Sequence, residues 1–90
     1  MGSYSVIITK AAAKEIEQID RRSDREKILD RIRQLSADPR PHGSKKLKGW
    51  HERYRLRQGD FRILYEIRDA ILIVTVVHVG HRKEVYRGNA

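Results

Sequence analysis

The feature that most constrains the fold is a stretch of alternating residues, YRLRQGDFRILYEI, which runs from 54 to 67. Apolar and polar side chains alternate with a period of two on both sides of Gln58-Gly59, as in two β-strands joined by a tight turn. The residues on the apolar face are Tyr54, Leu56, Phe61, Ile63, Tyr65 and Ile67. The stretch therefore predicts an antiparallel hairpin that buries one face and leaves the other accessible.

The other face of this hairpin is strongly basic. Its four arginines are Arg53, Arg55, Arg57 and Arg62. With Gln58-Gly59 as a two-residue loop, Arg55 would lie opposite Arg62, and like charges in that position destabilise a sheet. A phosphate between the two guanidinium groups would relieve the repulsion by accepting paired hydrogen bonds. A solvated face with local ion pairs to Asp60 and Glu66 is the alternative, but four arginines on one face favour an anion site.

The flanking segments complete an α+β pattern. A β-rich segment at 4–9 precedes two segments of helical periodicity, at 10–20 and 23–38. Thr9 is expected to cap the first helix, and Ser23 with Glu26 forms a capping box for the second. The expected fold is an N-terminal strand, a two-helix hairpin and an antiparallel three-strand meander, with the helices packed on one sheet face. The nearly continuous apolar segment 71–79 is expected to be a central strand.

Length and composition indicate a single domain spanning residues 1–90, in which residues 1–3 resemble a cloning remnant. The sequence contains no cysteine, and its longest apolar run, 70–77, is too short to cross a bilayer, so a cytoplasmic protein is expected.

The net charge is +8, and residues 45–90 contribute 11 Lys and Arg against 5 Asp and Glu, a net of +6. Such a surface usually has a polyanionic partner, most often nucleic acid, with an acidic protein or a membrane surface as the alternatives.

The segment 39–49 reads as a loop that holds three lysines suited to phosphate contacts, Lys45, Lys46 and Lys48, although lysine-rich loops are more often simply solvated. The four histidines do not cluster with carboxylates at the spacing of metal ligands. No metal or cofactor is therefore expected. His78 is in phase with Val74 and Val76 and is expected to be half-buried and structural.

The hairpin, together with the upstream KLKG and the downstream VGHRKEVY, resembles the RelE side of the RelE/ParE toxin superfamily over nearly the whole chain. The resemblance implies a small mRNA interferase that enters the ribosomal A site, cuts the messenger and is neutralised by a cognate antitoxin. It also implies site residues at Arg55, Arg57, Arg62, Arg82 and Tyr86. Two departures are that the family pattern has lysines where this chain has Arg55 and Arg57, and that the stretch from Arg82 to Tyr86 is shorter.

RNA cleavage of this type needs no metal, because the 2′-OH attacks the adjacent phosphate with the help of a base, an acid and stabilising cations. Arg62 and Arg82 are expected to stabilise the phosphate, while Arg53, Arg55 and Arg57 bind RNA. Arginine does not deprotonate in proteins, so the base must be another residue. Histidine titrates near neutrality, and neighbouring guanidinium groups would lower a tyrosine pKa. Tyr86 and His81 are therefore the candidates, with tail packing and loop exposure as their respective structural alternatives.

Three functions are compatible with the sequence. The leading one is a ribosome-dependent endoribonuclease toxin of a type II toxin–antitoxin system, with an acidic, partly disordered antitoxin as partner and no membrane association. The second is a ParE-like gyrase inhibitor, which shares the fold but lacks the nuclease residues. The third is a non-catalytic relative that binds RNA or an acidic protein.

Overall fold

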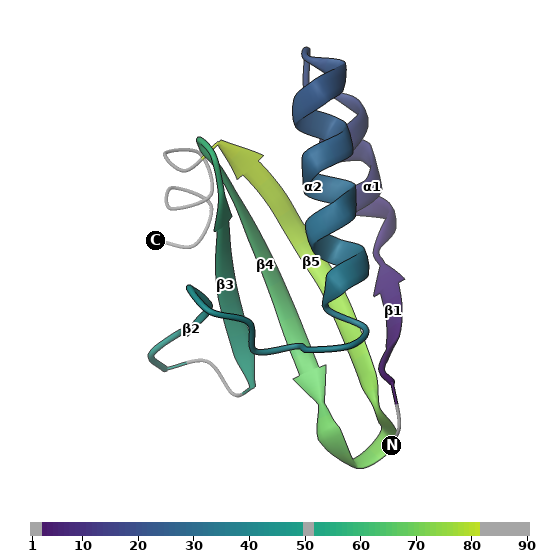
Figure 1. Ribbon diagram of the computed structural model, residues 1–90, viewed down its shortest axis with the longest axis vertical. Helices are drawn as coiled ribbons and strands as arrows, with labels where there is room; N and C mark the ends of the chain where they lie inside the picture. The colour runs from purple at the N-terminus through teal and green to yellow at the C-terminus, as the bar shows by residue number, and fades with distance from the viewer. Residues whose placement is uncertain (1–2, 50–51, 82–90) are drawn as a thin grey trace.

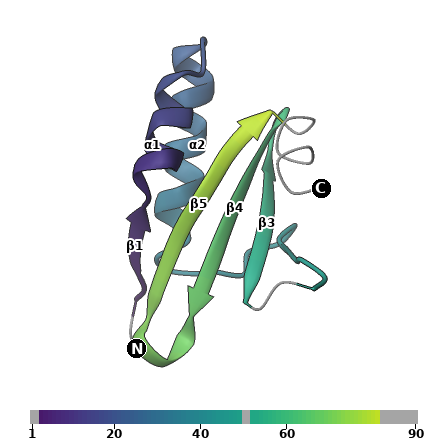
Figure 2. The same cartoon turned by 180° about the vertical axis from the view of Figure 1, so that it is seen from behind.

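The computed structural model describes residues 3–49 and 52–81 of the chain, which form two helices and a five-stranded sheet (Figures 1 and 2). The elements in chain order are β1 (Ser5–Ile8), α1 (Lys10–Glu17), α2 (Arg22–Gln34), β2 (Lys45–Lys46), β3 (Arg53–Gln58), β4 (Phe61–Arg68), a short 3-10 helix (Asp69–Ile71) and β5 (Ile73–His81). The α+β class and the order strand, helix, helix, meander are confirmed. Within the described residues, no helix is both long and apolar enough to span a membrane.

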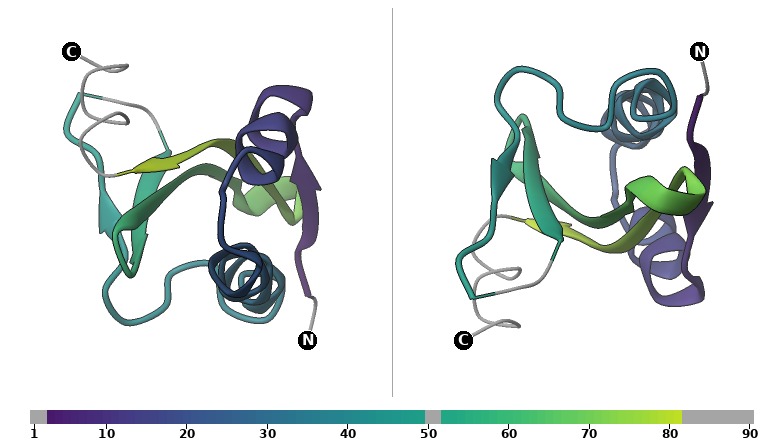
Figure 3. Two further views of the ribbon diagram at one scale, coloured as in Figure 1. Left: turned by 90° about the horizontal axis from the view of Figure 1, so that it is seen from above. Right: turned by 90° about the horizontal axis from the view of Figure 1, so that it is seen from below.

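The strands lie in the order β1-β5-β4-β3-β2, with β5 inside the sheet as expected for its apolar sequence. The β3, β4 and β5 strands form the antiparallel meander, and β1 joins β5 in parallel. The short β2 strand was not predicted, because its segment was assigned to a loop. It pairs with β3 at the edge opposite β1, and the chain reaches it from α2 along the α2 side of the sheet (Figures 1 and 3).

The first helix begins as the sequence predicts, because the Thr9 side chain accepts a hydrogen bond from the backbone N–H of Ala12 at 3.1 Å. The capping box predicted for the second helix is wrong. Its N-cap is Arg21, and Ser23 lies within the first helical turn. Glu26 pairs instead with Arg22, and the Arg25 side chain donates to backbone carbonyls of the connection between the helices.

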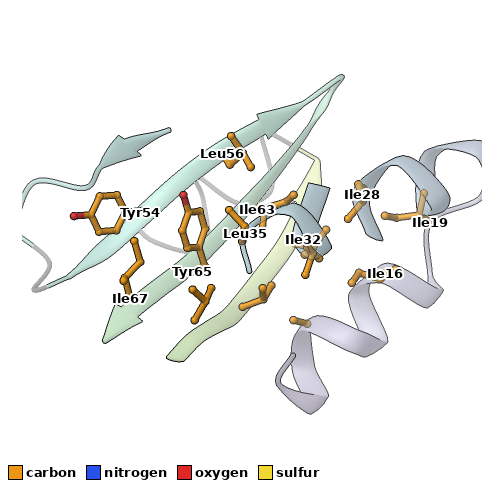
Figure 4. Close-up of a cluster of buried hydrophobic side chains, with 14 residues drawn as sticks. Ile16, Ile19, Ile28, Ile32, Leu35, Tyr54, Leu56, Ile63, Tyr65 and Ile67 are labelled. Carbon is orange, nitrogen blue, oxygen red and sulfur yellow. The ribbon is translucent and has the colours of Figure 1, made fainter. Parts of the chain in front are cut away.

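The hydrophobic core is a single cluster between both helices and one face of the sheet (Figure 4). Ile16 of α1, Ile19 of the connection between the helices, and Ile28 and Ile32 of α2 pack over strand residues such as Ile63. Each such side chain contributes about 1.5–3 kcal/mol when it is fully buried. The helices therefore cover one sheet face, as the apolar pattern predicts, and leave the opposite face for the arginines.

The hairpin turn differs from the prediction by one residue. Gly59 and Asp60 form the loop, with Gln58 opposite Phe61, and Gly59 adopts a φ of 59°. Glycine at the first central position with positive φ is typical of a type II′ turn, which suits the twist of a hairpin. Arg62 therefore lies opposite Arg57, not opposite Arg55. The side chains keep their predicted faces, because the new register shifts each cross-strand pair by two residues.

A β-bulge interrupts the pairing between β4 and β5. Tyr65 pairs with Val76 and Leu64 with His78, so Val77 is the extra residue. The bulge reverses the alternation along β5, and Val79 takes the core-facing phase that follows Val74 and Val76. The phase predicted for His78 is therefore wrong, because the period of two does not continue through a bulge.

Candidate functional site

The candidate site is the sheet face opposite the helices, where basic residues from three neighbouring strands meet. Arg57 on β3 lies opposite Arg62 on β4, and Arg55 lies opposite Lys45 on β2. Side chains of directly paired residues project from the same face of a sheet. We call Lys45, Arg55, Arg57 and Arg62 the basic face.

Arg62 is the inner residue of the basic face. Only 4% of its surface is exposed, whereas Arg57 is exposed and Arg55 is intermediate. Its partner on β5 is Gly80, which places no side chain beside it. The sequence led us to expect Arg62 outside the core, but the structure buries it together with Leu64, which is on the same face. Removing a guanidinium group from water is costly unless its charge is compensated.

Arg53 on β3 is paired with an acidic residue. Its Nη2 lies 2.6 Å from Oε2 of Glu66, which is also its cross-strand partner, and the two side chains are only 17% and 26% exposed. Glu66 therefore compensates the charge of Arg53. The local ion pair considered for Glu66 is thus formed with Arg53.

The structure separates the three lysines that are neighbours in sequence. Lys45 pairs with Arg55 and joins the basic face, whereas Lys46 pairs with Tyr54, a core residue on the opposite face. The Lys46 Nζ lies 3.7 Å from Glu52. Lys48 is exposed in the turn that follows β2. The structure therefore brings only Lys45 together with the arginines.

His81 lies at the end of β5, opposite Phe61. The two rings meet edge to face with centroids 6.1 Å apart, and Phe61 packs against the hydrophobic core. This places the His81 ring on the helix side of the sheet, away from the basic face. Arg82 and Tyr86, which complete the predicted catalytic set, lie outside the described residues.

A network that the sequence did not predict holds the segment leading to β2 against the sheet. Arg40 donates two hydrogen bonds to the Asp69 carboxylate, at 3.1 and 2.8 Å, and a third to the Tyr54 hydroxyl at 3.0 Å. The Tyr4 hydroxyl donates to the same carboxylate at 2.6 Å. Asp69 is 29 residues from Arg40 and 65 from Tyr4, so no local sequence pattern could have indicated these contacts.

The same network changes the ionisation of its members. The hydrogen bonds from Arg40 and Tyr4 lower the pKa of Asp69 from 3.8 to about 2, because they stabilise the carboxylate. The hydrogen bond to Asp69 raises the pKa of Tyr4. Burial raises the pKa of Tyr65 to about 12, and its hydroxyl donates to the Pro39 carbonyl at 2.8 Å. These contacts fix the chain just before Lys45 and so position the outer edge of the basic face.

The basic face can bind anions, and nothing in its geometry points to a metal. Among residues 3–49 and 52–81, no three His, Cys, Asp or Glu side chains lie close enough to hold a metal ion together. Guanidinium and ammonium groups on adjacent strands can bind successive phosphates of a nucleic acid, or the carboxylates of an acidic protein segment.

Comparison with known proteins identifies the family. Residues 6–86 match the family model described as the ParE toxin of the type II toxin–antitoxin system parDE. The chain belongs to the RelE/ParE superfamily and is a toxin of a type II toxin–antitoxin system. A search of curated proteins finds no match.

Solved structures of RelE toxins share the fold. The RelBE2 toxin–antitoxin complex from Mycobacterium tuberculosis has 26% identity and a TM-score of 0.76, and the match covers 89% of this chain and 99% of that chain. The isolated RelE toxin from E. coli has 25% identity and a TM-score of 0.76, and the match covers 97% of this chain and 95% of that chain. The RelE–RelB complex from Pyrococcus horikoshii is similar in fold. It has 24% identity and a TM-score of 0.79, and the match covers 89% of this chain and 96% of that chain.

Proposed function

We propose that this toxin is a ribosome-dependent mRNA endoribonuclease that inhibits translation in the cytoplasm. The observation that carries the proposal is the basic face, in which Arg62 is buried directly opposite Arg57 and beside the strand that leads to Arg82. Opposed arginines on one sheet face concentrate positive charge there, which supports a function that binds anions.

The proposed cleavage is an attack of the RNA 2′-OH on the adjacent phosphate, which leaves a cyclic phosphate and a 5′-OH. The buried Arg62, with Arg82, stabilises the negative charge that develops on the phosphate in the transition state. Burial makes this interaction stronger than it would be in water. The outer residues Lys45, Arg55 and Arg57 hold the neighbouring phosphates and so keep the messenger in register.

The proton of the 2′-OH is removed by Tyr86 or His81 in this proposal. The contact of His81 with Phe61 turns its ring away from the basic face, so Tyr86 is favoured as the base. A tyrosine facing several guanidinium groups has its anion stabilised, which lowers the pKa of its hydroxyl. The role of Tyr86 rests on its position in the sequence pattern and on this electrostatic argument.

Gyrase inhibition is the second candidate function, because the matching family model describes ParE toxins. Primer extension on ribosome-bound messenger, run beside a gyrase cleavage assay, distinguishes the candidates. We expect cuts within the A-site codon and no arrest of gyrase. Gyrase arrest without messenger cuts would establish the second function, and neither activity would indicate a non-catalytic relative that binds RNA or an acidic protein.

We also propose an acidic antitoxin segment, disordered when free, that covers the basic face. Relatives of this chain occur in complexes with antitoxins, as in the RelBE complex from E. coli. A net charge of +8 favours an acidic partner, and binding should weaken as salt screens the attraction. Co-purification with the protein encoded beside it tests this partner. Normal growth of cells that express the chain alone would argue against both partner and toxicity.

A further inference from the structure

One edge of the end of β5 pairs with β4, and the other edge, beyond the last residue paired with β1, is contacted by α1. The pairing of β1 with β5 extends from Ile73 to Val76. Beyond it, the Thr9 backbone N–H donates to the Val76 carbonyl at 3.1 Å, and Glu15 of α1 reaches the next part of the strand edge. A side chain of the helix thus takes over the hydrogen bonds that β1 no longer provides.

Both oxygens of the Glu15 carboxylate contact this part of β5. Its Oε1 accepts a hydrogen bond from the backbone N–H of Val79 at 3.0 Å, and its Oε2 lies 3.6 Å from Nδ1 of His78. Val79 is 1% exposed, and a buried backbone N–H without a partner is costly. Glu15 is itself held in place because the next residue, Ile16, is part of the core.

The position of this contact connects it to the basic face. Val79 follows the β-bulge at Val77, where the strand changes phase, and precedes Gly80, the cross-strand partner of Arg62. The chain then continues through His81 to Arg82. The pairing with β4 and the Glu15 contact on the opposite edge therefore act together on the part of β5 that places Gly80 beside Arg62.

We propose that Glu15 is a positioning residue of the nuclease site, which fixes the end of β5 by accepting the hydrogen bond of Val79. The inference rests on the proposed function. Glu15 does not touch the basic face, so it should affect the chemical step and leave the binding of messenger to Lys45, Arg55 and Arg57 unchanged. Misplacement of reacting groups by about 1 Å can cost roughly 100-fold in rate.

The test compares Glu15→Ala, Glu15→Gln and the control Glu17→Ala, which removes an exposed acid from the same helix. Cleavage of messenger on programmed ribosomes gives kcat and KM, and hydrogen exchange of the Val79 amide reports the contact itself. We expect Glu15→Ala to lower kcat about 10- to 100-fold with KM changed less than about twofold. Glu15→Gln should recover most of the rate, because its amide oxygen still accepts the hydrogen bond. The control should match the parent chain.

The proposal would be overturned if Glu15→Ala had the same kcat as the parent chain. It would also be overturned if KM rose by the same factor as kcat fell. Unchanged exchange at Val79 would overturn it as well. If Glu15→Ala does not fold, Glu15→Asp replaces it, since the shorter side chain loses the contact without removing the charge. Absence of cleavage by the parent chain would refute the proposed nuclease instead, and amide exchange would still show whether Glu15 fixes β5.

Discussion

Arg53 and Arg57 allow a direct test of whether the basic face opposes the fold. They project from the same face of β3, but Arg53 lies opposite Glu66 and Arg57 lies opposite Arg62. We expect Arg57→Gln to stabilise the protein and Arg53→Gln to destabilise it. The two substitutions remove the same charge from the same strand, so each serves as the control for the other.

The magnitudes follow from the two environments. Relief of a directly opposed like-charge pair is worth about 0.2–1 kcal/mol. The Arg53–Glu66 contact is short, at 2.6 Å, and only 17% and 26% exposed. Its loss should cost about 1–2 kcal/mol, between the value for an exposed ion pair and that for a hydrogen bond to a charged group. For a domain of this size, 1 kcal/mol corresponds to roughly 4–8 °C in Tm.

Thermal and urea unfolding at low and high salt provide the assay. The gain from Arg57→Gln should shrink as salt increases, because Arg57 is exposed and its repulsion is screened. The cost of Arg53→Gln should persist, because that pair is largely buried. Destabilisation by Arg57→Gln would refute the reasoning, since it would show that Arg57 supports the free fold and is not retained for binding an anion.

Three further predictions concern the network, the lysines and the base. The contribution of Asp69 to stability is complete above about pH 4 and is lost as pH falls towards its lowered pKa of about 2, so Asp69→Asn should flatten acid unfolding curves in that window. Lys45→Gln should weaken messenger binding and reduce its salt dependence more than Lys46→Gln does, because only Lys45 lies on the basic face. Tyr86→Phe should abolish most single-turnover cleavage and its pH dependence, whereas His81→Gln should change little; parental profiles for both would identify neither as the base.

The faces of the hairpin could be predicted from sequence, but the register could not. Loops at Gln58-Gly59 and at Gly59-Asp60 give pairings that differ by two residues, and both place the same side chains on the same faces. Alternation alone therefore cannot distinguish them, and only the turn geometry of Gly59 does. The Thr9 cap was predictable because its contact spans just three residues.

The features missed from sequence depend on contacts between distant residues. The two-residue β2 strand is too short to show a period, and it forms where Lys45 and Lys46 meet β3. Likewise, the bulge at Val77 leaves no mark in an apolar run in which both faces are hydrophobic. The burial of Arg62 was missed because an arginine in a period-two strand predicts exposure. The structure buries Arg62 instead. Arg62 is also a position where the proposed chemistry needs a desolvated cation.

The central claim is that the basic face cuts RNA, and the rate of messenger cleavage by Arg62→Met tests it most directly. Methionine keeps much of the volume of the buried side chain and removes its charge, and circular dichroism and Tm would confirm that the variant is folded. Single-turnover cleavage of the A-site codon on programmed ribosomes should fall by a factor of about 10 to 1,000, the usual range for loss of one transition-state contact. Cleavage at the parental rate by the folded variant would contradict the assignment of the site.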